Sequence, residues 1–166
     1  LVAKVLIGVI QRRKRLAAFK KPKRFDANVV VVGGGSAGLV TSLIVAGAKA
    51  KVVLVEKHRM GGDCLYTGCV PSKSIIRSGR IMSYIRRAAD YGIVDAAGKV
   101  DFAAVMQRVQ GVIETIEPHD SPERFTSLGV TCVSGSARLI SPYEVEVDGK
   151  IITTESIVIA SGARPL

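Results

Sequence analysis

The chain has 166 residues, of which 24 are Lys or Arg and 14 are Asp or Glu, so its net charge is +10. This length is enough to bury a core and predicts one domain. Nine of the basic residues and none of the acidic ones lie in residues 1–25, whereas residues 26–166 hold 15 basic and 14 acidic residues. The nearly neutral body argues against a nucleic-acid-binding domain, and we expect no nucleic-acid partner.

The N-terminal segment, residues 1–25, starts with a mostly apolar stretch, residues 1–10, and continues with the basic cluster. Ten residues cannot span a bilayer, which needs about 20. An apolar stretch followed by Lys and Arg nevertheless matches the cytoplasmic end of a membrane helix. A basic helix on a membrane surface and a solvated linker are the alternatives. We therefore expect a cytoplasmic protein, with tethering to the cytoplasmic face of a membrane left open.

A nucleotide-binding pattern begins at residues 29–32, four valines that indicate a strand buried on both faces. Gly33, Gly35 and Gly38 follow at G-x-G-x-x-G spacing and lead into a helix, residues 39–46. In this pattern the first glycine permits a tight turn, the second lets a pyrophosphate approach the backbone, and the third allows close helix–strand packing. The pyrophosphate would lie on the N-terminal amides of the helix.

The next predicted strand, residues 51–55, ends at Glu56, eighteen residues after Gly38. This is close to the spacing of the acid that accepts hydrogen bonds from a ribose in dinucleotide-binding folds. The order of strand, glycine turn, helix, strand and acid therefore predicts a dinucleotide site, in preference to a tight turn without a ligand.

Two cysteines, Cys64 and Cys69, lie five positions apart among glycines. On a regular helix they would be separated by about 7.5 Å along the axis and would point roughly 140° apart. A disulfide needs Cα atoms closer than about 7 Å, so a bridge demands a distorted turn, which Gly68 can supply. Pro71 suits the first turn of the following helix, residues 72–89, and the N-terminal end of that helix favours a thiolate.

Other interpretations of the cysteines are weaker. Cys64 and Cys69 have loop-like neighbours, which are poor core material, whereas Cys132, in the apolar stretch 130–133, fits a small core residue. Structural zinc usually takes four Cys or His ligands in short pairs, and the only histidines, His58 and His119, are distant in sequence. We expect no metal site.

The rest of the chain predicts a helix over residues 101–116 with Asp101 as its N-cap, and a short helix from Pro122. Strands are predicted over residues 130–134, 143–147, 151–154 and 157–160, with a hairpin at Asp148 and Gly149. The fold class is therefore α/β: a mainly parallel Rossmann-like sheet, a helical excursion that carries the cysteines, and a β-meander packed on the sheet.

Residues 61–73, from Gly61 through both cysteines to Lys73, resemble the redox-active segment of the pyridine nucleotide–disulfide oxidoreductases. Residues 157–165 resemble the strand and turn that close the FAD-binding half-domain of that family. The resemblance covers residues 26–166 and is strongest to the branch of mercuric reductase and dihydrolipoamide dehydrogenase. It implies an FAD-binding domain over residues 26–166.

The resemblance also implies roles. FAD would lie along the glycine loop, with Glu56 on the adenosine ribose. Cys69 would face the flavin, Cys64 would be the interchange thiol that meets substrate, and Lys73 would lie near the flavin. The cofactor-binding residues implied are Gly33, Gly35, Ser36, Ala37, Gly38, Glu56, Lys57, Gly62, Asp63, Ala160, Ser161 and Gly162.

The activity implied passes electrons from NAD(P)H through the flavin to the Cys64–Cys69 pair and on to a small-molecule disulfide or a metal ion. Mercuric ion reduction specifically, and a membrane-associated flavin-binding module without reductase activity, are the alternatives. The family usually has Asn where this chain has Tyr66, which would either pack over the pair or narrow access to it.

Two parts of the family's machinery are missing from the sequence. No second G-x-G-x-x-G follows Gly38, and the C-terminal interface domain, which supplies a His–Glu pair across a homodimer, is not present. We therefore expect the chain to be a piece of a larger, homodimeric enzyme. Alone, it is expected to bind FAD weakly and not to turn over NAD(P)H.

Overall fold

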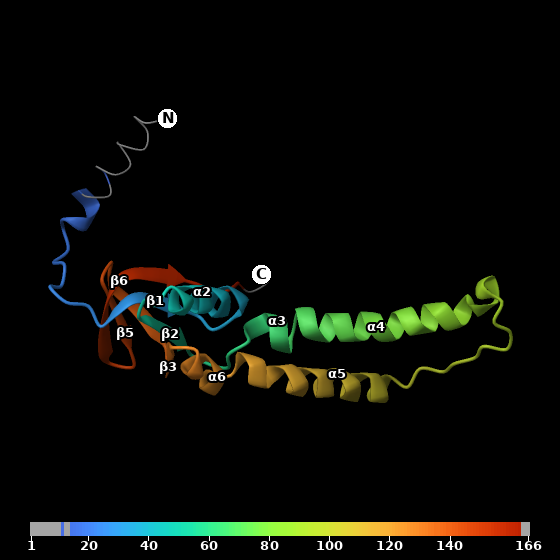
Figure 1. Cartoon of the computed structure of the whole chain (residues 1–166). Coiled ribbons are helices and arrows are strands. Elements are labelled where there is room, and N and C mark those ends of the chain that lie inside the picture. The colour runs from blue at the N-terminus through green and yellow to red at the C-terminus, as the bar shows by residue number, and fades with distance from the viewer. Residues whose placement is uncertain (1–10, 12–13, 164–166) are drawn as a thin grey trace. The chain divides into compact units, whose positions relative to one another are not determined.

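The computed structural model describes residue 11 and residues 14–163, and it divides the chain into two compact units (Figure 1). One unit joins Leu1–Arg59 to Phe125–Leu166, and the other is Met60–Arg124. The apolar stretch expected to relate to a membrane, residues 1–10, lies outside the described residues. Within the described part of the chain, no helix is both long enough and apolar enough to cross a bilayer.

The first unit is built on a six-stranded sheet with the strand order β3-β2-β1-β6-β5-β4 (Figure 1). β1 (Ala27–Val32) pairs in parallel with β2 (Val52–Glu56) and with β6 (Lys150–Ile159), and β2 pairs in parallel with β3 (Val130–Ser134). α2 (Ser36–Gly47) connects β1 to β2 and packs against both. The predicted α/β fold with a mainly parallel, Rossmann-like sheet is confirmed.

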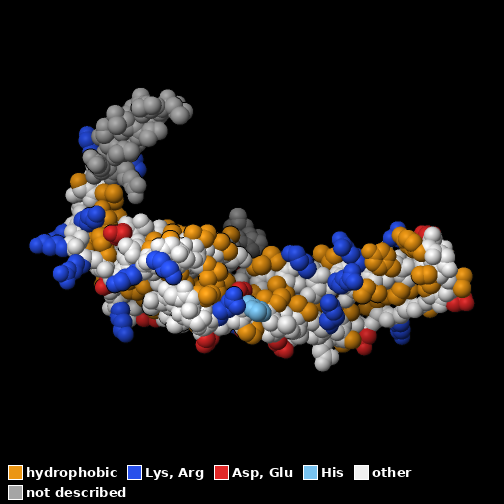
Figure 2. Space-filling model, in the orientation of Figure 1, with side chains coloured by type: hydrophobic (Ala, Val, Ile, Leu, Met, Phe, Trp, Pro, Cys, Tyr) orange, Lys and Arg blue, Asp and Glu red, His pale blue; other side chains and the backbone are white. Residues whose placement is uncertain are grey.

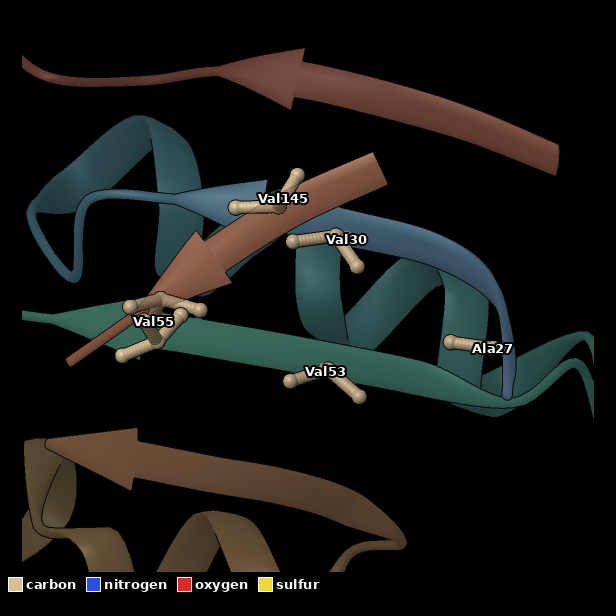
Figure 3. Close-up of a cluster of buried hydrophobic side chains, with 6 residues drawn as sticks. Ala27, Val30, Val53, Val55 and Val145 are labelled. Atoms are coloured by element: carbon tan, nitrogen blue, oxygen red, sulfur yellow. The ribbon is translucent and has the colours of Figure 1, made fainter. Parts of the chain in front are cut away.

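An antiparallel meander of β4 (Ala137–Ser141), β5 (Glu144–Val147) and the start of β6 packs on the parallel strands. The valines of β5 alternate with glutamates, so both valines point to the same side. Val145 is fully buried in one cluster with Val30 of β1 and Val55 of β2, and it lies beside Val30 (Figure 3). A β-meander packed on the parallel strands is therefore present, as predicted, although it consists of other strands than expected.

The strand boundaries differ from the sequence prediction in three ways. β3 belongs to the parallel sheet rather than to the meander, because its apolar residues pair with the buried β2. Residues 151–154 and 157–160, predicted as separate strands, form the single strand β6, which pairs first with β5 and then with β1. β4 was not predicted, because its largely exposed residues lack a clear apolar alternation. The Asp148–Gly149 turn is confirmed, with φ angles of 47° and 83°.

The second unit consists of helices. α3 (Gly62–Tyr66) is followed by α4 (Cys69–Arg86), which lies alongside α5 (Phe102–Ile116) (Figure 1). Asp101 caps α5 as predicted, because its carboxylate accepts a hydrogen bond of 3.1 Å from the N–H of Ala104. The predicted helical excursion thus forms a compact unit of its own.

The helix expected over residues 72–89 begins and ends earlier than predicted. α4 starts at Cys69, so Pro71 is its third residue, where the missing N–H costs no intrahelical bond. After Arg86 the chain forms η1 (Ala88–Tyr91) and turns at Gly92 with φ 74°. The remaining elements are η2 (Glu117–Asp120) and α6 (Pro122–Ser127), which lies across the boundary between the units.

Candidate functional site

The glycine turn after β1 is closed by backbone contacts that leave no room for a side chain. Gly33 has φ +109°, and its N–H donates a 2.8 Å hydrogen bond to the carbonyl of Val55. A Cβ at Gly33 would overlap the carbonyl of Ala160, and one at Gly38 would overlap the carbonyl of Gly33. Only glycine therefore fits at these two positions.

The turn leads directly into α2, whose first residues are Ser36 and Ala37. Gly35 precedes the helix in an extended conformation, and no side chain of the described structure caps it. The first N–H groups of a helix have no intrahelical acceptor and carry a partial positive charge. This end of α2 can therefore accept a phosphate oxygen.

Glu56, the last residue of β2, ties the glycine turn to the segment after β2. Its two carboxylate oxygens accept hydrogen bonds from the N–H of Gly34, at 2.6 Å, and from the N–H of His58, at 2.7 Å. A carboxylate has about four lone-pair positions. Glu56 thus retains capacity to accept a ribose hydroxyl, while Lys57 beside it is exposed. The role of Gly34 was missed, because its interaction is made by the backbone.

The residues after β6 reach the same edge of the sheet. The N–H of Ala160 donates a 2.7 Å hydrogen bond to the carbonyl of Val32, immediately before the glycine turn. Ser161 follows, and Gly162 has φ +73°. The first unit thus gathers the glycine turn, Glu56 and residues 160–162 at the carboxyl ends of parallel strands, where ligands bind in open α/β sheets.

The second unit holds the other predicted site residues: Gly62, Asp63, Cys64, Cys69 and Lys73. The break between α3 and α4 is closed by the carbonyl of Asp63, which accepts hydrogen bonds from the N–H of Thr67, at 3.0 Å, and of Gly68, at 2.5 Å. A Cβ on Gly68 would lie 2.9 Å from the same carbonyl oxygen. The distorted turn that a disulfide between the two cysteines would demand is therefore present at Gly68.

At this turn the two thiols interact with each other. The hydrogen bond with Cys64 is the main cause that raises the pKa of the Cys69 thiol, and the charge of Cys64 acts in the same direction. Lys73, one helical turn after Cys69, lowers that pKa by a smaller amount. The thiolate that the sequence predicts at the start of this helix is thus not favoured at Cys69, because the hydrogen bond and the charge of Cys64 outweigh the attraction of Lys73.

Tyr66, which departs from the family's usual Asn, points toward the end of α5. Its hydroxyl donates a 2.9 Å hydrogen bond to Oε1 of Glu117, and the side chain packs on the core of Leu65, Val109 and Ile113. Sequence reasoning missed Glu117, because 51 positions separate the two residues. Glu117 carries no motif that marks it as a partner.

We predict that Cys64→Ala lowers the pKa of Cys69, because the substitution removes both the hydrogen bond and the charge that raise it. The iodoacetamide reaction of Cys69 at pH 8 should become about two- to tenfold faster, since the thiolate is the nucleophile. Mass spectrometry of the Cys69 peptide across a pH series measures the effect, with Cys132 in the same digest as the internal control. An unchanged midpoint of the pH dependence of Cys69 alkylation would contradict the prediction.

Comparison with known proteins places these features in one family. Residues 27–166 match the family described as pyridine nucleotide-disulphide oxidoreductase. Among curated relatives, a dihydrolipoyl dehydrogenase of Mycoplasma pneumoniae is 34% identical over 147 residues, covering 83% of this chain and 30% of that protein. A dihydrolipoyl dehydrogenase of Chlamydia muridarum is 35% identical over 139 residues, covering 82% of this chain and 30% of that protein.

A mercuric reductase of Staphylococcus aureus is 29% identical over 140 residues, covering 84% of this chain and 26% of that protein. The chain thus spans at most about a third of the length of these relatives. The family and these relatives imply FAD and a nicotinamide nucleotide as cofactors, as expected from the sequence. This chain belongs to the pyridine nucleotide-disulphide oxidoreductase family.

Proposed function

We propose that this chain is the flavin-binding part of an FAD-dependent disulfide oxidoreductase in which Cys64 and Cys69 form the redox-active pair. The observation that carries the proposal is the turn at Gly68, which holds the two thiols together at the start of α4. A helix without this break would keep the cysteines apart. Family membership supports the same role for the pair.

The residues of the first unit fit a dinucleotide. The uncapped start of α2 at Ser36 and Ala37 would hold the pyrophosphate, and Gly33, Gly35 and Gly38 would keep side chains out of its path. Glu56 would accept a hydrogen bond from the adenosine ribose. Lys57 and residues 160–162 would complete the cofactor site at this edge of the sheet. When bound, FAD would supply two-electron transfer between a nicotinamide and the thiol pair.

In this proposal the cysteines have different roles. Cys69, the first residue of α4, would face the flavin, and Lys73 would favour its thiolate. Cys64, which is partly buried in α3, would exchange with the acceptor. Gly62 and Asp63 would lie beside the cofactor. The acceptor would be a small-molecule disulfide or a metal ion, and the whole enzyme would use NAD(P)H and act as a homodimer.

Substitution of either cysteine in the full-length protein tests the proposal. Cys64→Ser and Cys69→Ser should each lower NAD(P)H-dependent reduction of a disulfide by at least about 100-fold, since one sulfur alone cannot cycle between dithiol and disulfide. The flavin absorbance should remain. Cys132→Ser is the matched control, because Cys132 lies in β3 of the other unit. Activity that survives in either single variant would refute the role of the pair.

The 166-residue chain by itself is expected to bind FAD weakly and not to consume NAD(P)H, because it holds one glycine motif and spans about 30% of its dihydrolipoyl dehydrogenase relatives. Titration followed by flavin fluorescence measures FAD binding. Absorbance of the reduced nicotinamide, at roughly 340 nm, measures NAD(P)H consumption. Steady consumption above a flavin-only blank would contradict this expectation.

We also propose that the N-terminal segment, residues 1–25, binds anionic membrane surfaces. Its nine basic residues have no acidic residue among them, whereas the rest of the chain is nearly neutral. Figure 2 shows basic side chains gathered over the described part of this segment. Those that the structure describes are all exposed: Lys14, Arg15, Lys20, Lys21, Lys23 and Arg24. Each would contribute about 1 kcal/mol to binding at an anionic surface.

Vesicle flotation with phosphatidylserine tests this proposal. Replacing Lys20, Lys21, Lys23 and Arg24 by Gln should weaken binding by at least about tenfold. The matched control replaces four exposed arginines of the helical unit by Gln and should bind as the wild type does: Arg77, Arg80, Arg86 and Arg87. Equal loss of vesicle binding in both variants would contradict the proposal. So would binding to a nucleic acid that is tighter than binding to the vesicles.

A further inference from the structure

Cys64 lies in the five-residue helix α3, which is too short to be stable without contacts to other elements. Isolated helices shorter than about 12 residues are marginal in water. α3 has one buried residue, Leu65, which is 2% exposed. The position of Cys64 must therefore be fixed by contacts that α3 makes with other elements.

Two of these contacts converge on α5 and its end. Leu65 packs into the core with Val109 and Ile113 of α5. Tyr66 packs on the same core and donates its hydroxyl to Glu117, the residue immediately after α5. The apolar contact of Leu65 allows α3 to shift along α5. The hydrogen bond of Tyr66 joins two defined atoms at 2.9 Å and therefore fixes the orientation of α3.

Because of the position of Tyr66 in the chain, the orientation of α3 affects the separation of the two sulfurs. Tyr66 lies between Cys64 and Cys69, directly before the turn in which the carbonyl of Asp63 accepts from Thr67 and Gly68. A hydrogen bond from a phenol to a carboxylate is among the stronger kinds in proteins. If α3 rotates or shifts at Tyr66, the separation of the two sulfurs changes with it.

We infer that the Tyr66–Glu117 hydrogen bond is a latch that positions Cys64 beside Cys69 and thereby favours the disulfide over the dithiol. Tyr66 and Glu117 are positioning residues in this inference, which rests on the proposed redox role of the pair. Holding two thiols at a fixed separation raises their effective concentration for each other, and loosening them lowers it. Loss of the latch should therefore move the equilibrium toward the dithiol.

The experiment equilibrates the protein with dithiothreitol in its reduced and oxidised forms. The cysteine pair gives up two electrons and two protons as the Sγ–Sγ bond forms, and oxidised dithiothreitol takes up both as its ring disulfide opens. Alkylation and mass spectrometry then give the fraction of disulfide. Tyr66→Phe should move the equilibrium constant toward the dithiol by about three- to tenfold. The variant should also shift the pH profile of Cys69 alkylation to lower pH, because the thiols separate.

Tyr91→Phe is the matched control, since Tyr91 is a tyrosine of the same unit that is 63% exposed, and it should leave both readouts unchanged. Glu117→Gln keeps an acceptor oxygen and should cause a smaller shift in the same direction. The double variant should match Tyr66→Phe alone, because Tyr66→Phe already removes the Tyr66–Glu117 hydrogen bond that both substitutions target. Additive shifts, or an unchanged equilibrium in Tyr66→Phe, would overturn the latch.

The outcomes separate the latch from the proposed function. The thiol equilibrium is measured without NAD(P)H turnover, so the predicted shift in a protein that binds no flavin would support the latch and refute the oxidoreductase proposal. A flavin-binding, active protein with an unchanged Tyr66→Phe equilibrium would refute the latch alone. A wild-type pair that never forms the disulfide would refute both.

Discussion

Close approach of two backbone segments, where no Cβ can fit, is the constraint on which both parts of the candidate site depend. In the first unit the carbonyl of Ala160 occupies the space that a Cβ of Gly33 would need. In the second unit the carbonyl of Asp63 lies where a Cβ of Gly68 would crowd it. The first approach joins the ends of β1 and β6, and the second joins α3 to α4. Both use backbone groups, so glycine is the residue that the geometry selects.

Polar side chains then hold these turns in position. Glu56 accepts hydrogen bonds from the N–H groups of Gly34 and His58, which joins the glycine turn to the segment after β2. Tyr66 donates a hydrogen bond to Glu117 next to the turn at Gly68. In each case a carboxylate is the acceptor, and hydrogen bonds to charged groups are shorter and stronger than neutral ones. A carboxylate that organises the apo turn and also accepts a ribose hydroxyl would be preorganised for its ligand, which lowers the cost of binding.

Much of this arrangement follows from the sequence, because local patterns determine it. Valine runs predict the parallel strands, and glycine spacing predicts the turn into α2. A disulfide across the five-residue cysteine spacing would demand a break in the helix. Contacts between distant residues could not be predicted in the same way. The Tyr66–Glu117 bond is one such contact, and the pairing of β3 with β2 is another. β6 was divided in two because its central Thr154, Glu155 and Ser156 resemble a loop, although Thr154 is fully buried and donates its hydroxyl to the carbonyl of Ser156.

The electrostatics of the thiol pair bear on how it would work. Ionisation of one sulfur opposes ionisation of the other, so the two protons leave the reduced pair in separate steps. The hydrogen bond with Cys64 and the charge of Cys64 raise the pKa of Cys69, and Lys73 offsets part of that effect. An exchange step needs one thiolate to attack and a neighbouring thiol to resolve the mixed disulfide. A pair that resists losing its second proton meets both needs, because after the first ionisation it retains one thiol beside one thiolate.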